Sequence, residues 1–486
     1  MQRVRVNRVM FAGVLAGVAA VAVACGGDKA TAPRPLGTPV VSRVNGVSVP
    51  TGLVGMTVMI EGTELGDAAR GTVYFRGTGD TRVAATVASA DWTNEYIITT
   101  VPMGTADTSK VWVETTGGVS DSVDFLLVTG STFSPSNISW TVTAAMPQAL
   151  QGLGAAFVPV ERGSDKRNFV FVAGGAADQT GTATSAVYRA QVEQSGALGT
   201  WTDAVTQLPA ARAFHTVAAA TRYTAPLDTL TAAYLFVVGG VDEAGATVST
   251  VHAARVALDG SLGAWQPVTA LPAPVHAAGA VVFRGYLYVS GGADAENHPV
   301  ATAYRAKISA SGSLGAWEAL PALPNETAFH AMVNFGPYLY VVGGDSGTVV
   351  PALNTTSGTE TGAAYLARVD VRDGSVASWS AVTSPNKARS KHGMITAGGS
   401  LLLTSGVYAG QAGSSENSYA VINADGSLAS WNGATGSSTI DVLLGYALYN
   451  EAAVSFVDAQ GVGHVLVLGG GRRATPGRAS SAVVYY

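Results

Sequence analysis

The chain has 486 residues and a formal net charge of -5, with 13 % charged residues, 47 % hydrophobic residues and 59 glycines. This length allows two or three domains, and the absence of a long basic run after the N-terminal leader argues against nucleic acid as the main partner. Low charge with abundant Gly, Ala, Val, Thr and Ser is typical of all-β proteins with many tight turns.

The first residues have the pattern of an export signal. Three arginines precede an apolar run, residues 9–24, that is short for a membrane span. The run ends in AVAC, and Cys25 is the only cysteine of the chain. The stretch resembles a bacterial lipobox, in which the cysteine is lipidated and becomes the first mature residue. We therefore expect a signal peptide over 1–24 and an exported lipoprotein, periplasmic or at the cell surface, that is anchored to the membrane through Cys25; a free cysteine is the alternative.

The next two segments differ in composition. Residues 25–38 are rich in Gly, Pro and Ala, which predicts a flexible tether. Residues 39–130 contain short alternating stretches bounded by glycines, such as TVMIEGTEL, TVYFRGT and KVWVETTGG, and predict an antiparallel β-sandwich. Their order of Gly, Pro and strand residues resembles the IPT/TIG immunoglobulin-like domain, a resemblance that implies no catalytic residue.

Residues 137–486 repeat one order of signals, and the six tryptophans from Trp140 to Trp431 lie 52 to 64 residues apart. Each unit has a strand of small residues, an apolar strand ending in Gly-Gly, a variable loop, a third strand and a turn that leads to the tryptophan. Four strands per unit predict propeller blades. The doublet, the tyrosine and the tryptophan resemble the kelch repeat. We therefore expect an all-β chain in which a six-bladed kelch-like β-propeller follows the sandwich.

The count of strands predicts how the ring closes. Six strands end in Gly-Gly or Ser-Gly, but the first tryptophan strand precedes them all and the last unit lacks one. We expect residues 138–144 to pair with the C-terminal strand and to complete the sixth blade. Closure of this kind removes two exposed sheet edges.

The recurring stretch LDGSLGAW is similar at first sight to the Asp-box of sialidases. Gly260 precedes Trp265 by five residues, however, where the Asp-box requires three. We interpret the stretch as a hairpin turn that needs a positive φ, followed by a tryptophan that packs between blades. These turns then lie on one face of the ring. The variable loops after the doublets lie on the opposite face, which we call the Gly-Gly face.

The Gly-Gly face holds the candidate ligand-binding residues. Aspartates after the doublets suit calcium or sugar hydroxyls, but capping of their own turns is the favoured interpretation. Histidines near the innermost strands suit a metal or an anion, but their repetition favours a contact that holds blades together. Basic residues form a third candidate site. The favoured alternative is that their charges are simply solvated. The candidates are Asp178, Asp242, Asp294, Asp345, His215, His276, His330, His392, Arg389, Lys391 and Arg472.

No Ser-His-Asp signature, zinc motif, phosphate loop or nucleotide fingerprint occurs in the sequence. Kelch propellers include galactose oxidase, but its copper site uses a tyrosine cross-linked to a cysteine, and Cys25 belongs to the lipobox. We expect a binding protein for a glycan or a protein. No cofactor is expected, and calcium is the alternative that the loop aspartates would suit. An extracellular carbohydrate-active enzyme that uses loop carboxylates is the competing hypothesis. A structural surface protein without a ligand is the third.

Overall fold

The computed structural model describes residues 36–45, 50–52, 54–127, 138–162, 165–177, 182–203, 206–222, 230–349, 359–408, 416–423, 425–433, 440–444, 446–458, 462–472, 480 and 483–485. All of them belong to one compact unit, Leu36–Tyr486. The described residues are strands and loops apart from three short segments, η1 (Thr78–Asp80), η2 (Ser89–Asp91) and α1 (Ile440–Leu444). The expectation of an all-β chain is thereby confirmed. In the described part of the chain, no helix has the length and apolar character that a membrane crossing requires.

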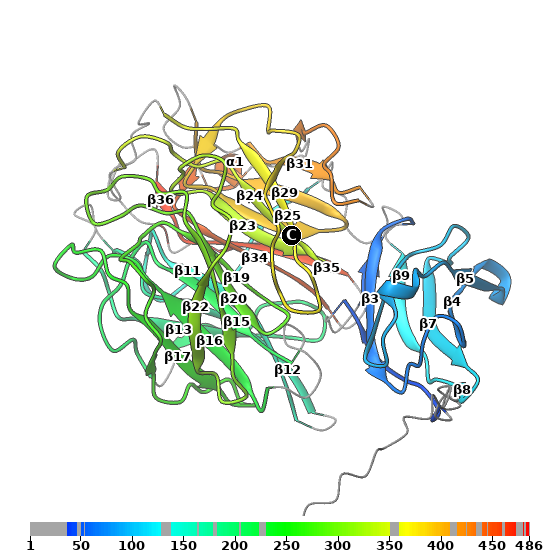
Figure 1. Cartoon of the computed structure of the whole chain (residues 1–486). Helices are drawn as coiled ribbons and strands as arrows, with labels where there is room; N and C mark the ends of the chain where they lie inside the picture. Colours follow the sequence, from blue (N-terminus) through cyan, green and yellow to red (C-terminus); the bar gives the residue numbers. More distant parts are fainter. Residues whose placement is uncertain are drawn as a thin grey trace, which may run out of the picture. The chain divides into compact units, whose positions relative to one another are not determined.

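Nine strands form two sheets around a shared core, which we call the sandwich (blue and cyan in Figure 1). One sheet has the order β1-β3-β6, and the other has the order β2-β9-β7-β4-β5 with β8 beside β7. Side chains alternate between the faces of a strand, so Val73 and Phe75 of β4 lie beside Val111 and Val113 of the neighbouring strand β7, in a core that excludes solvent. The strands are β1 (Val40–Val44), β2 (Thr51–Gly52), β3 (Thr57–Thr63), β4 (Gly71–Arg76), β5 (Arg82–Ala85), β6 (Tyr96–Thr100), β7 (Thr108–Thr115), β8 (Gly118–Val119) and β9 (Val123–Leu127).

Six four-stranded antiparallel sheets follow in the described residues, and they resemble the blades of a propeller. The first contains β11 (Gly154–Arg162), β12 (Asp165–Ala173), β13 (Val187–Val192) and β14 (Thr202–Asp203). The second contains β15 (Thr216–Ala220), β16 (Ala233–Val238), β17 (Val251–Val256) and β18 (Gln266–Val268). The third contains β19 (Gly279–Phe283), β20 (Tyr286–Ser290), β21 (Ala303–Ile308) and β22 (Leu314–Ala319).

The remaining sheets are built in the same way. The fourth contains β23 (Ala331–Phe335), β24 (Tyr338–Val342), β25 (Ala364–Arg368) and β26 (Ser380–Ala381). The fifth contains β28 (Gly393–Ala397), β29 (Ser400–Thr404), β31 (Ser418–Val421) and β32 (Asn432–Gly433). The sixth contains β34 (Ala452–Val457), β35 (Gly463–Leu468), β37 (Val483–Tyr485) and β10 (Thr141–Val142). Two small pairs accompany them, β27 (Arg389–Ser390) with β30 (Val407–Tyr408) and β33 (Leu448–Tyr449) with β36 (Gly471–Arg472).

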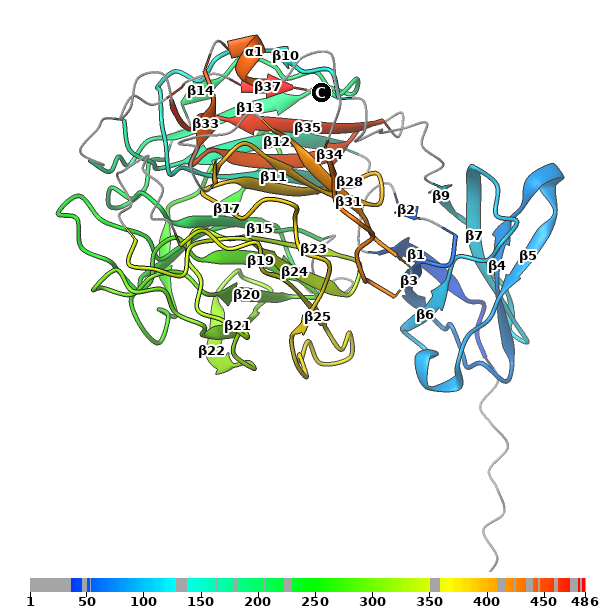
Figure 2. The ribbon, with the colours of Figure 1, turned by 90° about the horizontal axis from the view of Figure 1, so that it is seen from above.

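The six sheets close into a ring through their innermost strands. Contacts run from β11 to β15, β19, β23, β28 and β34 in that order, and β34 also contacts β11. In the sixth sheet, Thr141 pairs with Tyr485 and Val142 with Val484, so that β10 lies beside β37 (Figure 2). This register confirms the predicted pairing of residues 138–144 with the C-terminal strand.

The recurring turn is a packing element between sheets. Gly260 has a φ of 76°, and a Cβ atom at this position would lie 2.5 Å from Cε1 of Phe169 in the preceding sheet. Glycine is therefore required both by the backbone conformation and by the space. At the equivalent turn of the fourth sheet, the Tyr288 hydroxyl of the third sheet donates a hydrogen bond to the Gly374 carbonyl at 2.7 Å.

The tryptophan that follows each turn also joins neighbouring sheets. The indole N–H of Trp317 donates to the carbonyl of Thr269 at 3.0 Å, and that of Trp431 donates to the carbonyl of Thr383 at 2.7 Å. In both cases the acceptor belongs to the segment that ends the preceding sheet. Trp265 of LDGSLGAW itself joins the sheets by apolar packing, in one buried cluster with Phe169 and Phe171 of the preceding sheet, which confirms the packing interpretation.

Removal of residues 480–486 should destabilise the ring, because β35 and β10 would each lose the strand between them. We expect the melting temperature to fall by roughly 10 °C or more, measured by circular dichroism of residues 26–486. A variant that lacks residues 26–35, which precede β1, should melt as the parent does. Unchanged melting of the C-terminal truncation would contradict the closure.

Candidate functional site

A closed belt of backbone hydrogen bonds joins the six sheets on the Gly-Gly side. Each belt residue lies two positions before an innermost strand, and its N–H donates to the carbonyl of the belt residue in the preceding sheet at 2.7 to 3.0 Å. All six have a φ between 51° and 57°, a left-handed conformation that is costly for a residue with a side chain. The belt residues are Gly152, Phe214, Ala277, Phe329, Lys391 and Asn450.

Four belt residues are glycine or apolar, and the other two, Lys391 and Asn450, form a polar part of the belt. The rings of Phe214 and Phe329 meet edge to face at a centroid distance of 5.9 Å. Lys391 Nζ lies 5.1 Å from the centroid of the Phe329 ring, within the range of a cation–π interaction. Asn450 is buried, and its Nδ2 has no hydrogen-bond partner among the described residues. A strictly repeated position therefore becomes polar in the fifth and sixth sheets.

Lys391 is a buried cation. Burial lowers the pKa of its ammonium group to about 8, while the nearby carboxylates of Asp345 and Glu360 act in the opposite direction. At pH 7 about nine in ten Lys391 side chains are therefore protonated. The sequence interpretation of Lys391 as a solvated charge is wrong, because only 7 % of the residue is exposed.

Arg389 is also buried, at 1 % exposure, and its role is structural. Its guanidinium donates to the carbonyl of Ser405, the first residue of its own doublet, at 3.3 Å. Arg212 makes the same contact with the carbonyl of Gly239 at 2.9 Å in the second sheet. The third basic candidate, Arg472, is partly exposed, and its guanidinium carbon lies 4.6 Å from the centroid of the Tyr446 ring.

Three of the predicted histidines occupy one repeated position, directly after the belt. A Cβ atom at Gly174, the first glycine of the preceding doublet, would lie 2.5 Å from Cε1 of His215. His330 and His392 cover the equivalent glycines of their neighbouring sheets in the same way. Each imidazole thus fills the space that its glycine leaves open, which is a packing role.

His276 differs from the other three, which corrects the expectation of one histidine per blade at equivalent positions. It lies directly before the belt residue Ala277, and its Nδ1 is 3.1 Å from the hydroxyl oxygen of Thr247. Burial lowers the pKa of His276 and His330 to about 4 and that of His215 and His392 to about 3. All four imidazoles are therefore neutral at physiological pH.

The aspartates after the doublets cap their own turns. Asp242 Oδ1 accepts hydrogen bonds at 2.9 Å from the backbone N–H groups two and four residues further on, and Asp294 Oδ1 does so at 3.0 and 2.8 Å. Asp345 accepts from the N–H two residues on at 3.2 Å and from the Thr359 hydroxyl. Cys25 and Asp178 lie outside the described residues. No group of three or more metal-ligating side chains converges in the described part of the chain.

An open groove of about 450 Å³ lies on the Gly-Gly face of the fourth sheet, and we call it the fourth-sheet groove. Asn325 Nδ2 donates to Tyr365 Oη at 2.6 Å on one wall. Glu326 is exposed and has no ion-pair partner among the described residues. Its remaining lining residues are Pro324, Thr327, Ser346, Thr361 and Ala363.

Sequence reasoning did not single out the groove residues. The loop PNETAF connects a fourth strand to the next first strand, so its position in the repeat predicts this face but no particular site. The other wall combines Ser346, which closely follows the doublet, with residues that follow the long variable loop, such as Thr361 and Tyr365. The sequence does not specify that these segments meet. The one available signal was a loop rich in hydrogen-bonding side chains at the point where the repeats differ.

No family model and no curated protein matches the chain. Among solved structures, the chain is similar to the one reported as "Structure of YjhT", with 14 % sequence identity and a TM-score of 0.48 over 70 % of this chain and 95 % of that chain.

The buried histidines should make the fold sensitive to acid. Their pKa values in the folded chain lie below the unfolded value of 6.5, so the unfolded state binds more protons and the free energy of unfolding falls as the pH drops from 6.5 toward 4. Each histidine contributes up to about 1.4 kcal/mol per pH unit in that window. Glu451 acts in the opposite direction, because burial raises its pKa to about 7 and the folded chain holds its proton between pH 4.5 and 7.

Substitution His330→Gln should therefore flatten the pH dependence of the urea midpoint between pH 7 and pH 5, measured by fluorescence. His298→Gln, at an exposed position, is the matched control and should leave the slope unchanged. Equal slopes for the parent and His330→Gln would show that this imidazole does not remain neutral in the fold.

Proposed function

We propose that this chain is an exported, lipid-anchored binding protein that recognises a glycan through the Gly-Gly face of a six-bladed kelch-like propeller. Lipidation of Cys25 would hold it at a membrane, and residues 25–38 would form the tether. The sandwich, which resembles an IPT/TIG domain in sequence, would lie between the tether and the propeller. The observation that carries the proposal is the chemistry of the fourth-sheet groove.

The groove offers the hydrogen-bonding groups that a sugar requires. Hydroxyl groups of Ser346, Thr361 and Tyr365 both donate and accept, and the Asn325 amide adds a carbonyl oxygen. Glu326 supplies a carboxylate that no described cation neutralises, and it can accept from sugar hydroxyls. The volume is within the range of small-ligand sites, roughly 300 to 1,000 Å³.

Binding is favoured over glycoside hydrolysis by the distribution of carboxylates. Hydrolysis requires two carboxyl groups about 5 to 10 Å apart across the scissile bond. Glu326 is the one carboxylate among the described lining residues of the groove. The predicted loop aspartates are engaged in capping their own turns, so their oxygens are partly satisfied already.

The groove lies next to residues that interact with the polar part of the belt, at Lys391. Ser346 lines the groove directly after Asp345, and the Asp345 carboxylate acts on the buried ammonium of Lys391. Thr327 is fixed beneath the groove by donating its hydroxyl proton to the Gly343 carbonyl at 3.1 Å. The walls are therefore anchored to the rigid centre of the ring, which reduces the ordering cost of binding.

The test is a glycan-array screen of the mature chain carrying Cys25→Ser, followed by calorimetric titration of each hit. Glu326→Gln and Tyr365→Phe should each weaken binding at least about tenfold, since each removes a buried or charged hydrogen bond to the ligand. Tyr304→Phe, at the equivalent position of the third sheet, is the matched control and should bind as the parent does.

Binding that survives both groove substitutions would refute the site. Capture of a protein in place of any glycan, with the same loss in both variants, would replace the ligand class by a protein. Turnover of a bound glycan that is lost in Glu326→Gln would make the protein an enzyme.

The membrane anchor has a separate test. Cys25→Ser should move the protein from the membrane fraction to the soluble fraction and abolish incorporation of labelled fatty acid. An unchanged distribution would contradict anchoring through Cys25.

A further inference from the structure

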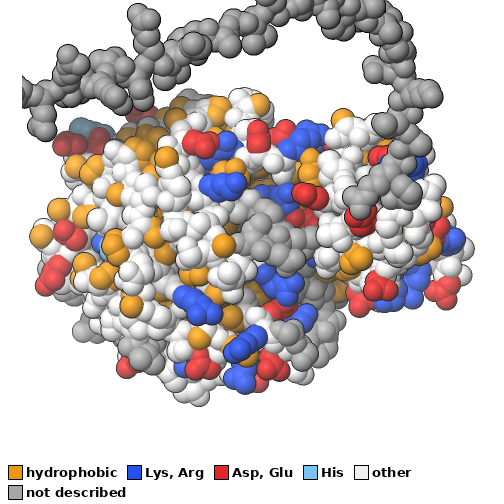
Figure 3. Space-filling model, turned by 60° about the horizontal axis from the view of Figure 1, so that its bottom comes forward, with side chains coloured by type: hydrophobic (Ala, Val, Ile, Leu, Met, Phe, Trp, Pro, Cys, Tyr) orange, Lys and Arg blue, Asp and Glu red, His pale blue; other side chains and the backbone are white. Residues whose placement is uncertain are grey.

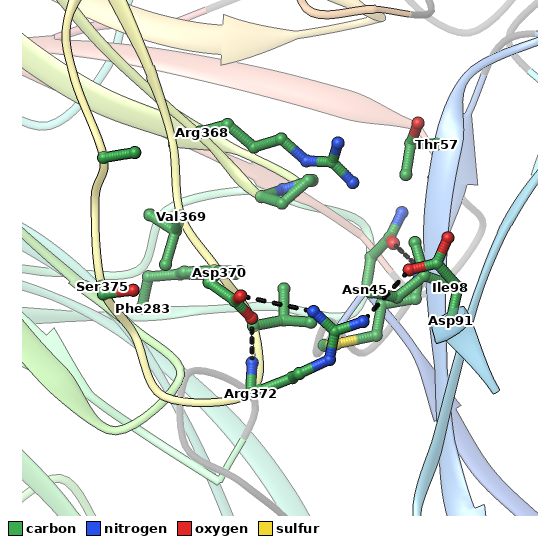
Figure 4. Close-up of a pocket in the computed structure, with 15 residues that line it drawn as sticks. Asn45, Thr57, Asp91, Ile98, Phe283, Arg368, Val369, Asp370, Arg372 and Ser375 are labelled. Carbon is green, nitrogen blue, oxygen red and sulfur yellow. Dashed lines mark hydrogen bonds and ion pairs between the residues drawn. The ribbon is translucent and has the colours of Figure 1, made fainter. Parts of the chain in front are cut away.

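A second cleft, of about 400 Å³, lies between the sandwich sheet β1-β3-β6 and loops of the third and fourth propeller sheets (Figure 4). These loops belong to the face opposite the Gly-Gly face, where the recurring turns lie, and we call it the turn face. We propose that this junction cleft binds a small amphipathic carboxylate, a molecule with an apolar body and a single carboxylate group. The proposal is independent of the fourth-sheet groove, which lies on the opposite face of the ring.

The floor of the junction cleft is apolar and preformed. Met59 and Ile98 of the sandwich belong to one hydrophobic cluster with Phe283 and Val369 of the propeller, and all four are at most 9 % exposed. Burial of apolar surface on both sides holds the two walls together. The cleft can therefore accept the apolar part of a ligand without first being assembled.

A buried ion triplet beside the floor fixes the spacing of the walls. Glu61 of β3 is 2 % exposed and accepts a hydrogen bond from Arg43 Nε at 2.6 Å. Arg284, in the turn between β19 and β20, forms an ion pair with the same carboxylate and donates to the Val371 carbonyl at 3.3 and 3.2 Å. Glu61 thus links an arginine of the sandwich to an arginine of the propeller.

The two carboxylates at the rim are already paired. Arg372 lies 3.3 Å from Asp370 and 3.5 Å from Asp91, and it donates to the Ala90 carbonyl at 2.6 Å. These contacts cross from the propeller to the sandwich (Figure 4). Arg372 thus orients both carboxylates, and neither of them forms an ion pair with Arg368.

Arg368 is the cation that remains. It extends from the end of β25 across the cleft toward Thr57 and Asn45 (Figure 4), and it has no hydrogen-bond or ion-pair partner among the described residues. The Asn45 side-chain carbonyl accepts from the Met59 N–H at 2.8 Å, which leaves the amide N–H groups as donors. A guanidinium and an amide group that face a cleft and have no hydrogen-bond acceptor among the described residues suit a carboxylate, which can bind arginine through two oxygens.

Charge balance points in the same direction. Arg43 and Arg284 both pair with Glu61, and Arg372 pairs with Asp91 and Asp370. Arg368 is the one arginine of the cleft without a carboxylate partner among the described residues. On the face shown in Figure 3, Lys and Arg side chains are interspersed with Asp and Glu. The mixed charges produce no strong long-range electrostatic attraction of a ligand, so recognition depends on the individual groups of the cleft.

The repeat supplies a matched control. Arg255 is the last but one residue of β17, the equivalent third strand of the second sheet, and it precedes Val256 as Arg368, the last residue of β25, precedes Val369. Both side chains are exposed, but only Arg368 lines the cleft whose other wall is the sandwich. Loss of a guanidinium at Arg255 therefore changes the same chemistry without changing the proposed site.

In the test, the mature chain carrying Cys25→Ser is titrated with N-acetyl-leucine and, separately, with N-acetyl-leucinamide. Binding is measured by saturation-transfer NMR. The two probes share an apolar body and differ in the carboxylate. We expect the acid to bind with a dissociation constant on the order of 1 mM and the amide at least about tenfold more weakly. Hexanoate, in a parallel arm, distinguishes a fatty-acid body from a peptide-like one, and saturable binding of either acid supports the proposal.

Arg368→Met should abolish binding of the acid and leave the melting temperature and glycan binding unchanged, while Arg255→Met should have no effect on any of the three. Equal binding of the acid and the amide, equal losses in the two variants, or no saturable binding of either acid would overturn the proposal.

Discussion

The belt of backbone hydrogen bonds around the ring is the interaction on which the propeller depends. Each bond runs between neighbouring sheets, and the last one, from Gly152 to the Asn450 carbonyl, joins the first sheet to the sixth. The left-handed conformation of all six residues is tolerated because the same geometry recurs at every junction. The belt fixes the sheets at one spacing and leaves the belt side chains free to differ.

The two faces of the ring consequently have different roles. On the turn face, glycines and tryptophans such as Gly260 and Trp317 repeat because each sheet must pack on its predecessor. On the Gly-Gly face, the histidines and glycine doublets perform the same task close to the axis. Once these packing residues are accounted for, the variation that remains lies in the belt side chains and the outer loops, and the fourth-sheet groove is found there.

Much of the architecture follows from the sequence because periodic packing leaves periodic residues. The number of sheets, the pairing of β10 with β37 and the packing role of LDGSLGAW were all predictable in this way. The burial of Lys391 was not, because sequence gives charge but not solvent exposure. The junction cleft was also beyond reach, since Arg368 and Thr57 are far apart in the chain and only the docked sheets bring them together.

The pairing of Thr141 with Tyr485 also has a kinetic consequence. The strand of this pair that is synthesised first must wait for the strand that is synthesised last, so the ring stays open during synthesis and closes in one late step. Contacts between such distant residues slow folding because a long loop must be ordered before they form. The partly folded chain then exposes two strand edges, and a neighbouring copy could pair with them before the proper partner arrives.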